Sequence, residues 1–187
     1  MRKFCFVLVV VSSGLAFAAR AQVTNIPPTR LEAFEQQTGT VIVKGAGDIG
    51  SLGVGVANIT VISKESTDIS TGRKEYGIAV EADANNQRVW KKVLDYDEID
   101  GLLGGLNYLA KVDYNATSLP TFVAGYSTKS GLRVGAFTSQ RRGAIQFFLH
   151  DYTTNGDRIL ITPTQLAQFE NLIEQAKKSQ DALRAAK

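Results

Sequence analysis

Two stretches of the sequence share one pattern, a β-prone run followed by a helix-capping residue and an amphipathic helical run. Residues 88–112 read RVWKKVLDYDEIDGLLGGLNYLAKV, and residues 158–179 read RILITPTQLAQFENLIEQAKKS. A shift of 67 positions aligns Leu106 with Ile173, and the other apolar helix positions follow, so both helices carry the same apolar stripe. Each stripe needs an apolar surface to cover it, which makes an internally duplicated fold the main expectation.

The starts of the two helices also agree in their chemistry. Thr162 is an N-cap residue followed by a proline at the first helical position, and Gln165 completes a capping box. Asp95 and Glu98 repeat this spacing before the first helix. Gly101, Gly104 and Gly105 weaken that helix by about 1 kcal/mol each, so we expect them where the helix approaches a sheet closely.

Four β-prone segments precede each helix. The first four cover 40–45, 53–63, 74–83 and 87–95, and the second four cover 121–127, 131–138, 143–151 and 157–162. Upstream of the third strand the shift becomes 80, which places Leu52 on Leu132. We assign the difference to the polar stretch 63–74, interpreted as a longer hairpin loop in the first half.

These patterns predict an α+β fold of two β4α units, each an antiparallel four-stranded sheet followed by a helix, packed as one domain. The expected division is a signal peptide at 1–21, an N-terminal leader at 22–39, a first unit at 40–112 and a second unit at 113–187. The leader contains a short helical pattern through Leu31 and Phe34 that stops at Gly39.

Four strands and a helix, taken twice, resemble the Whirly-type single-stranded-DNA-binding fold. The resemblance is one of topology over roughly residues 40–180 and includes no matched sequence motif. The Lys-Gly-Lys-Ala-rich binding stretch of that family has only VKGAG, Val43–Gly47, as a counterpart. The resemblance implies an architecture and assigns no functional residue.

The first 21 residues have the layout of a secretory signal peptide, with a basic start, an apolar run from Phe4 to Phe17 and small residues at the end. We therefore expect an exported protein, periplasmic or extracellular. Cleavage would remove Cys5, Arg2, Lys3 and Arg20, which leaves no cysteine and 18 basic against 18 acidic residues (21 − 3 = 18). A neutral mature chain makes nucleic acid an unlikely partner.

Two local motifs favour structural roles. GAGDIG, Gly45–Gly50, matches a dinucleotide-binding fingerprint, but a strand pattern follows it in place of the required helix, so a hairpin or bulge is expected. The acidic run Asp95–Gly101 lacks the spacing of a calcium loop and suits the first turn of a helix. The sequence therefore indicates no cofactor and no metal.

Basic and aromatic side chains supply the candidate binding residues. Such residues on one sheet face would suit stacking and charge contacts with a single-stranded polyanion, and the lone histidine could act as a general base. The candidates are Trp90, Lys92, Arg133, Arg141, Arg142 and His150.

The sequence as a whole contains a complete fold pattern without a catalytic constellation. We therefore expect an exported, non-enzymatic binding or structural protein whose ligand the sequence does not name. The alternatives are a binder of single-stranded nucleic acid or another polyanion, and a hydrolase-like enzyme that uses His150. A protein partner or a second copy of the chain is the expected kind of interaction.

Overall fold

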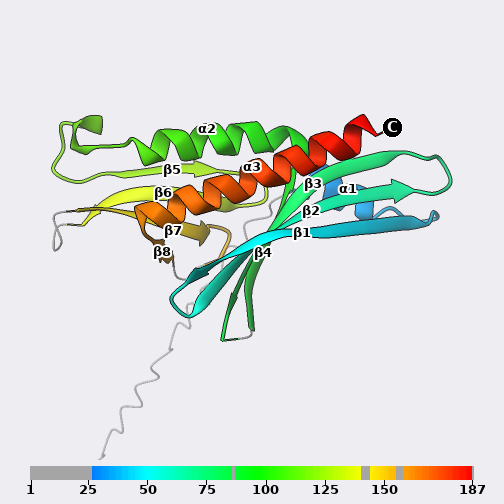
Figure 1. Ribbon diagram of the computed structural model, residues 1–187, viewed down its shortest axis with the longest axis horizontal. Helices are drawn as coiled ribbons and strands as arrows, with labels where there is room; N and C mark the ends of the chain where they lie inside the picture. Colours follow the sequence, from blue (N-terminus) through cyan, green and yellow to red (C-terminus); the bar gives the residue numbers. More distant parts are fainter. Residues whose placement is uncertain (1–26, 86, 140–143, 155–157, 187) are drawn as a thin grey trace, which may run out of the picture.

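The computed structural model describes residues 27–85, 87–139, 144–154 and 158–186. The strands form two antiparallel four-stranded sheets, ordered β1-β2-β3-β4 (sheet 1) and β5-β6-β7-β8 (sheet 2) (Figure 1). Two β4α repeats in the α+β class are thereby confirmed. The elements are α1 (Arg30–Glu35), β1 (Ile42–Val54), β2 (Ala57–Asp68), β3 (Lys74–Ala84), β4 (Gln87–Asp95), η1 (Tyr96–Glu98), α2 (Ile99–Ala110), η2 (Tyr114–Ala116), β5 (Val123–Ser127), β6 (Leu132–Ser139), β7 (Ala144–Asp151), β8 (Ile159–Ile161) and α3 (Pro163–Ala185).

The first hairpin differs from the predicted boundaries. β1 continues through the Gly-rich stretch, which contains a β-bulge between Asp48 and Gly50, one of the two alternatives expected for it. The chain reverses at Gly55, whose φ of +60° suits a glycine. The expected long loop at 63–74 is wrong, because β2 extends to Asp68 and only residues 69–73 separate it from β3.

The alignment by 80 positions holds at the start of β1, where Val43 aligns with Val123 of β5, and fails farther along the strand. Leu52 lies in β1, whereas Leu132 lies in β6. The physical reason is strand length: β1 and β2 have 13 and 12 residues, whereas β5 and β6 have 5 and 8. The first half is therefore longer in its strands and not in a loop.

Each long helix covers the sheet of the other half of the chain. α2 follows sheet 1 but packs on β5 and β6, and α3 follows sheet 2 but packs mainly on β1 and β2. The two helices lie side by side, and Lys177 near the end of α3 reaches Asp100 at the start of α2 with Nζ 3.2 Å from Oδ1. Neither helix therefore covers the sheet that precedes it in the chain.

One apolar core joins both halves. The predicted stripes are confirmed, since Leu102, Leu106, Phe169 and Ile173 are all fully buried. They pack with the inner faces of both sheets in a single cluster. Burial of a side chain of this size contributes about 1.5–3 kcal/mol, so the two halves stabilise each other.

Two glycines of α2 pack against the ring of Tyr126 in sheet 2, which confirms the predicted close approach of this helix to a sheet. A Cβ atom added at Gly105 would lie 2.7 Å from Cγ of Tyr126, and one at Gly101 would also meet that side chain. Gly104 has nothing within 4 Å of the same position. Only two of the three glycines therefore serve this contact.

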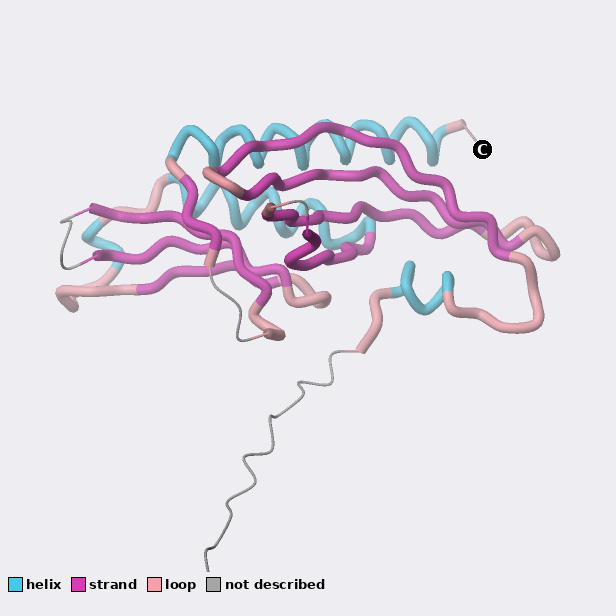
Figure 2. The backbone as a smooth tube through the Cα atoms, turned by 90° about the horizontal axis from the view of Figure 1, so that it is seen from below, coloured by secondary structure: helices cyan, strands magenta, loops and turns pink. Residues whose placement is uncertain are grey.

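The leader helix α1 lies on the face of sheet 1 opposite to α3 (Figure 2). Leu31 and Phe34 are buried there, as the leader pattern predicted, and Leu31 packs with Ala79 and Val93. At the end of α1, Glu35 accepts hydrogen bonds from Lys64 Nζ at 2.5 Å and Ser66 Oγ at 2.9 Å. The polar residues of β2 thus hold α1 on the sheet.

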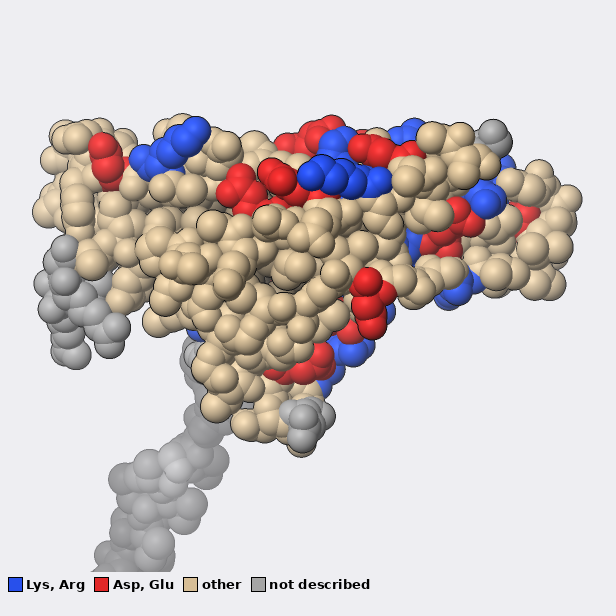
Figure 3. Space-filling view, viewed as in Figure 1, with Lys and Arg blue, Asp and Glu red and all other residues tan. Residues whose placement is uncertain are grey.

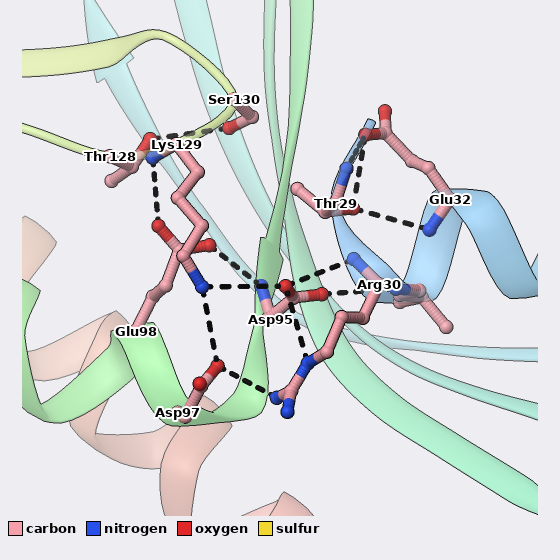
Figure 4. A network of polar contacts seen from close by, with 10 residues as sticks. Thr29, Arg30, Glu32, Asp95, Asp97, Glu98, Thr128, Lys129 and Ser130 are labelled. Atoms are coloured by element: carbon pink, nitrogen blue, oxygen red, sulfur yellow. Dashed lines mark hydrogen bonds and ion pairs between the residues drawn. The ribbon is translucent and has the colours of Figure 1, made fainter. Parts of the chain in front are cut away.

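The start of α1 is capped from a distant part of the chain (Figure 4). The carboxylate of Asp95, at the end of β4, accepts hydrogen bonds from the backbone N–H groups of Arg30 and Leu31, both at 3.0 Å. Glu98 accepts from the backbone N–H of Asp95 at 3.2 Å and of Lys129 at 2.8 Å. These acids thus connect the leader, sheet 1 and the β5–β6 turn.

The glycine contacts give a first prediction. Gly105→Ala should lower the free energy of unfolding by about 1–2 kcal/mol. The added methyl group overlaps Tyr126, and the strain energy of this overlap exceeds the gain in helix propensity. Gly104→Ala, the matched control, should raise it by up to about 1 kcal/mol. Urea unfolding measures both, and equal effects of the two substitutions would contradict the close approach.

The Asp95 network gives a second prediction. Asp95→Ala should cost about 1–2 kcal/mol, as the loss of a helix cap does, and should speed amide exchange at Arg30 and Leu31. Asp97→Ala is the control, because the Asp97 side chain is 53% exposed and makes only ion pairs with Arg30 and Lys129, which contribute less than about 1 kcal/mol. Unchanged exchange in the Asp95 variant would refute the capping role.

Candidate functional site

The predicted binding residues that the structure describes do not form one cluster. Trp90 and Lys92 point from β4 toward the interior, where both are buried. Arg133 on β6 and His150 on β7 are opposite each other in register on sheet 2, and both are half-buried. Arg141 and Arg142 lie outside the described residues. The described candidates therefore form no continuous basic face.

Lys92 forms a buried ion pair between the two sheets. Its Nζ lies 2.7 Å from Oδ1 of Asp151 at the end of β7 and donates to Thr153 Oγ1 at 3.0 Å. Burial alone would raise the pKa of the Asp151 carboxyl, but hydrogen bonds from Lys92 and Thr153 outweigh it and hold that pKa below its usual value. Lys92 is therefore occupied within the fold.

The outer face of sheet 2 combines aromatic rings with arginine. Phe137 and Phe148 lie with ring centroids 6.0 Å apart, and Cζ of Arg158 stands 4.6 Å from the Phe148 centroid and 5.7 Å from that of Phe137. This contact between cation and ring resembles the chemistry expected of a nucleic-acid-binding face. The ring faces are, however, already covered by the protein's own arginine.

Ser127 lies too far from His150 in sheet 2 to serve as its nucleophile. In the register of sheet 2, Arg133 stands between His150 and Ser127. Two strand spacings correspond to roughly 9–10 Å, which is beyond a hydrogen bond. Among the described residues, no group of three or more His, Cys, Asp and Glu side chains could hold a metal ion.

A groove lies between the edge strand β1 and α3. It has a volume of about 660 Å³. We call it the amide groove, lined by Ser51, Leu52, Gly53, Thr164, Ala167, Gln168, Asn171, Leu172 and Gln175. No lining side chain is charged, and much of the surface around β1 below the helices is likewise free of charge (Figure 3).

Two contacts fix the walls of the amide groove. Gln165 Nε2 donates to the backbone carbonyl of Gly53 at 2.9 Å, which ties the start of α3 to the end of β1. A Cβ atom added at Gly50 would lie 2.8 Å from Leu172, so the middle of α3 rests directly on the bulged part of the strand. The groove is therefore part of the packed structure.

Sequence reasoning named none of the residues that line this groove, although a pattern for them exists. Thr164, Gln168, Asn171 and Gln175 follow helical spacing and form an uncharged polar stripe beside the buried stripe of α3. Such a stripe is unusual on an exposed helix face, where charged residues are common. The pattern alone does not reveal which strand lies opposite.

Comparison of the chain with protein-family models, with curated proteins and with solved structures finds no match. The order of strands and helices agrees with the topological resemblance noted above, but no family model supports membership in the Whirly-type family. None of the helices in the described part of the chain has the length and apolar character of a membrane span.

The buried ion pair gives a third prediction. Lys92→Met leaves the Asp151 carboxylate buried without its counter-ion and should lower the free energy of unfolding at pH 7 by roughly 3 kcal/mol. The double variant with Asp151→Leu should recover most of this loss, because no charge then remains in the interior. Urea unfolding of both variants tests the pair, and a double variant no more stable than the single one would contradict it.

The pH dependence of the same variants follows from the sign of each shift. In the wild type the Asp151 pKa is lowered, so its contribution is present above the unfolded-state value near pH ~3.9 and is lost as pH falls below it. In Lys92→Met burial should raise that pKa, so the deficit should shrink as pH falls and the carboxyl takes up a proton.

Proposed function

We propose that the protein is a non-enzymatic binding module whose ligand site is the amide groove. The observation that carries the proposal is the pairing of an edge strand with a stripe of uncharged amide and hydroxyl side chains. Both walls offer hydrogen-bond donors and acceptors, and neither offers a charge or a general base. Such a surface suits recognition of a neutral ligand and does not suit hydrolysis.

The ligand class that fits is an extended, uncharged polypeptide segment. Among the described strands β1 pairs with β2 alone, so backbone N–H and C=O groups along its other edge are available to a further strand. The Gly53 carbonyl is an exception, because it accepts from Gln165. Asn and Gln side chains carry the same amide groups as a peptide backbone. Addition of a strand to a sheet edge is an established mode of peptide recognition.

A polyanion binder remains the second candidate, in line with the Whirly-type topology. The observation in its favour is the layer of Arg158 over Phe137 and Phe148, with Arg133 in the neighbouring strand. Against it stand the covered ring faces, the neutral amide groove and the equal numbers of acidic and basic residues in the chain after residue 21.

The third candidate, a hydrolase that uses His150, has the least support. Its base would need a nucleophile within hydrogen-bond reach, and Ser127 lies beyond Arg133 in the register of sheet 2. Loss of p-nitrophenyl acetate hydrolysis in a His150→Ala variant would favour it over a binding module.

The fourth prediction distinguishes a peptide ligand from a polyanionic ligand. Titration of ¹⁵N-labelled protein with a capped, uncharged octapeptide of Thr, Val and Ser should shift amide signals at Ser51–Gly53 and along 164–175. A (dT)12 oligonucleotide, added at low and then at higher salt, should shift none of them, because the groove has no cation to replace the released counter-ions.

Asn171→Trp should fill the amide groove and abolish the peptide shifts. Asn107→Trp is the matched control, since Asn107 is an exposed asparagine on α2, away from the groove. Peptide shifts that persist in Asn171→Trp would refute the site. Salt-sensitive oligonucleotide shifts on the outer face of sheet 2 would instead support the polyanion binder.

A further inference from the structure

The outer half of β1 carries a run of exposed residues whose charges are incompletely paired. All six residues from Val43 to Asp48 are exposed, and this run lies on the free edge of sheet 1. Within the described residues, Asp48 has no ion-pair partner, and Lys44 Nζ reaches Glu35 only at 3.6 Å, while Lys64 holds the same carboxylate at 2.5 Å.

We propose that this edge pairs with β1 of a second copy of the chain in an antiparallel, two-fold symmetric arrangement centred on Ala46. In this register residue numbers on the two strands sum to 92 (46 + 46), so Lys44 is opposite the partner copy's Asp48, and Asp48 is opposite its Lys44. Opposite charges at directly facing positions stabilise antiparallel strands. The two-fold axis makes the contact twice.

The side chains permit a close approach of the two strands. Gly45, Ala46 and Gly47 occupy the centre of the proposed contact. Lys44 and Asp48 lie on one face of sheet 1, because they are opposite Ser66 and Ile62, which contact α1. Both charged pairs would therefore form on the same face as α1.

On the opposite face of the same edge, a depression lies where an apolar side chain of the second copy would be placed. Val43 is 52% exposed, and in the proposed register it is opposite Ile49 of the second copy. Ile49 borders a depression of about 380 Å³ that also includes Ser179 and Leu183 at the end of α3. The second copy's Val43 would lie beside Ile49 at this depression, whose lining also includes Asp48 and Glu65. Each strand thus contributes an apolar side chain and an apolar neighbour for it.

The proposed contact is separate from the amide groove. The bulge between Asp48 and Gly50 bends β1 where the pairing would end, and the groove begins at Ser51. A lysine and a bulge also protect the edge strands of monomeric proteins. The measured mass in solution distinguishes these two roles.

The fifth prediction concerns oligomeric state. Sedimentation and light scattering of the chain lacking residues 1–21 should give twice the monomer mass. Lys44→Asp and Asp48→Lys should each raise the dimer dissociation constant roughly ten- to a hundredfold, because each places two like-charge pairs across the axis. The double variant Lys44→Asp/Asp48→Lys should restore dimerisation, since the facing charges are again opposite.

Two controls separate this contact from other effects of the substitutions. Lys111→Asp matches the net-charge change of Lys44→Asp at an exposed position outside β1 and should leave the mass unchanged. The double variant does not restore the contact of Lys44 with Glu35 on α1. Recovery of dimerisation in this variant therefore cannot come from that contact. A monomeric wild type at high micromolar concentration, or a double variant no better than the single ones, would overturn the proposal.

Discussion

The exchange of helices between the two halves is the constraint on which the rest of the structure depends. α2 covers sheet 2 and α3 covers sheet 1, so neither half can bury the apolar face of its sheet with its own helix. Each exposed face would lose the burial of several Leu, Ile and Phe side chains, at about 1.5–3 kcal/mol each. The two β4α repeats are consequently one folding unit, although the sequence repeats between them.

Polar contacts then fix how the halves meet. An apolar core alone is non-directional, whereas Lys92 on β4 finds its buried counter-ion only when Asp151 on β7 reaches it. Glu98 adds a second directional contact, since it bonds the backbone of both Asp95 and Lys129. An unpaired charge in the interior is strongly destabilising. Arrangements of the two sheets that separate Lys92 from Asp151 are therefore disfavoured.

Local patterns predicted what depends on local physics. The buried stripes of α2 and α3, the capping box at Thr162 and the strands of the second half all follow from spacing and from neighbouring residues. Alternation along β4 puts Trp90 and Lys92 on one side of the strand, but it cannot reveal which side is covered. Contacts such as Asp95 with Leu31, 64 residues apart, depend on the tertiary fold and have no local signature.

The surfaces that remain exposed in the folded chain explain why both proposed binding sites lie on β1. Inner faces of the two sheets are buried with α2 and α3, and α1 covers part of the outer face of sheet 1. On the outer face of sheet 2, Arg158 already covers the rings of Phe137 and Phe148. β1 is different, because Gly45, Ala46 and Gly47 at its centre are small, six successive residues are exposed and its outer edge pairs with no other described strand. A long edge strand of this kind can pair with another chain, and both the peptide site and the dimer contact use this property.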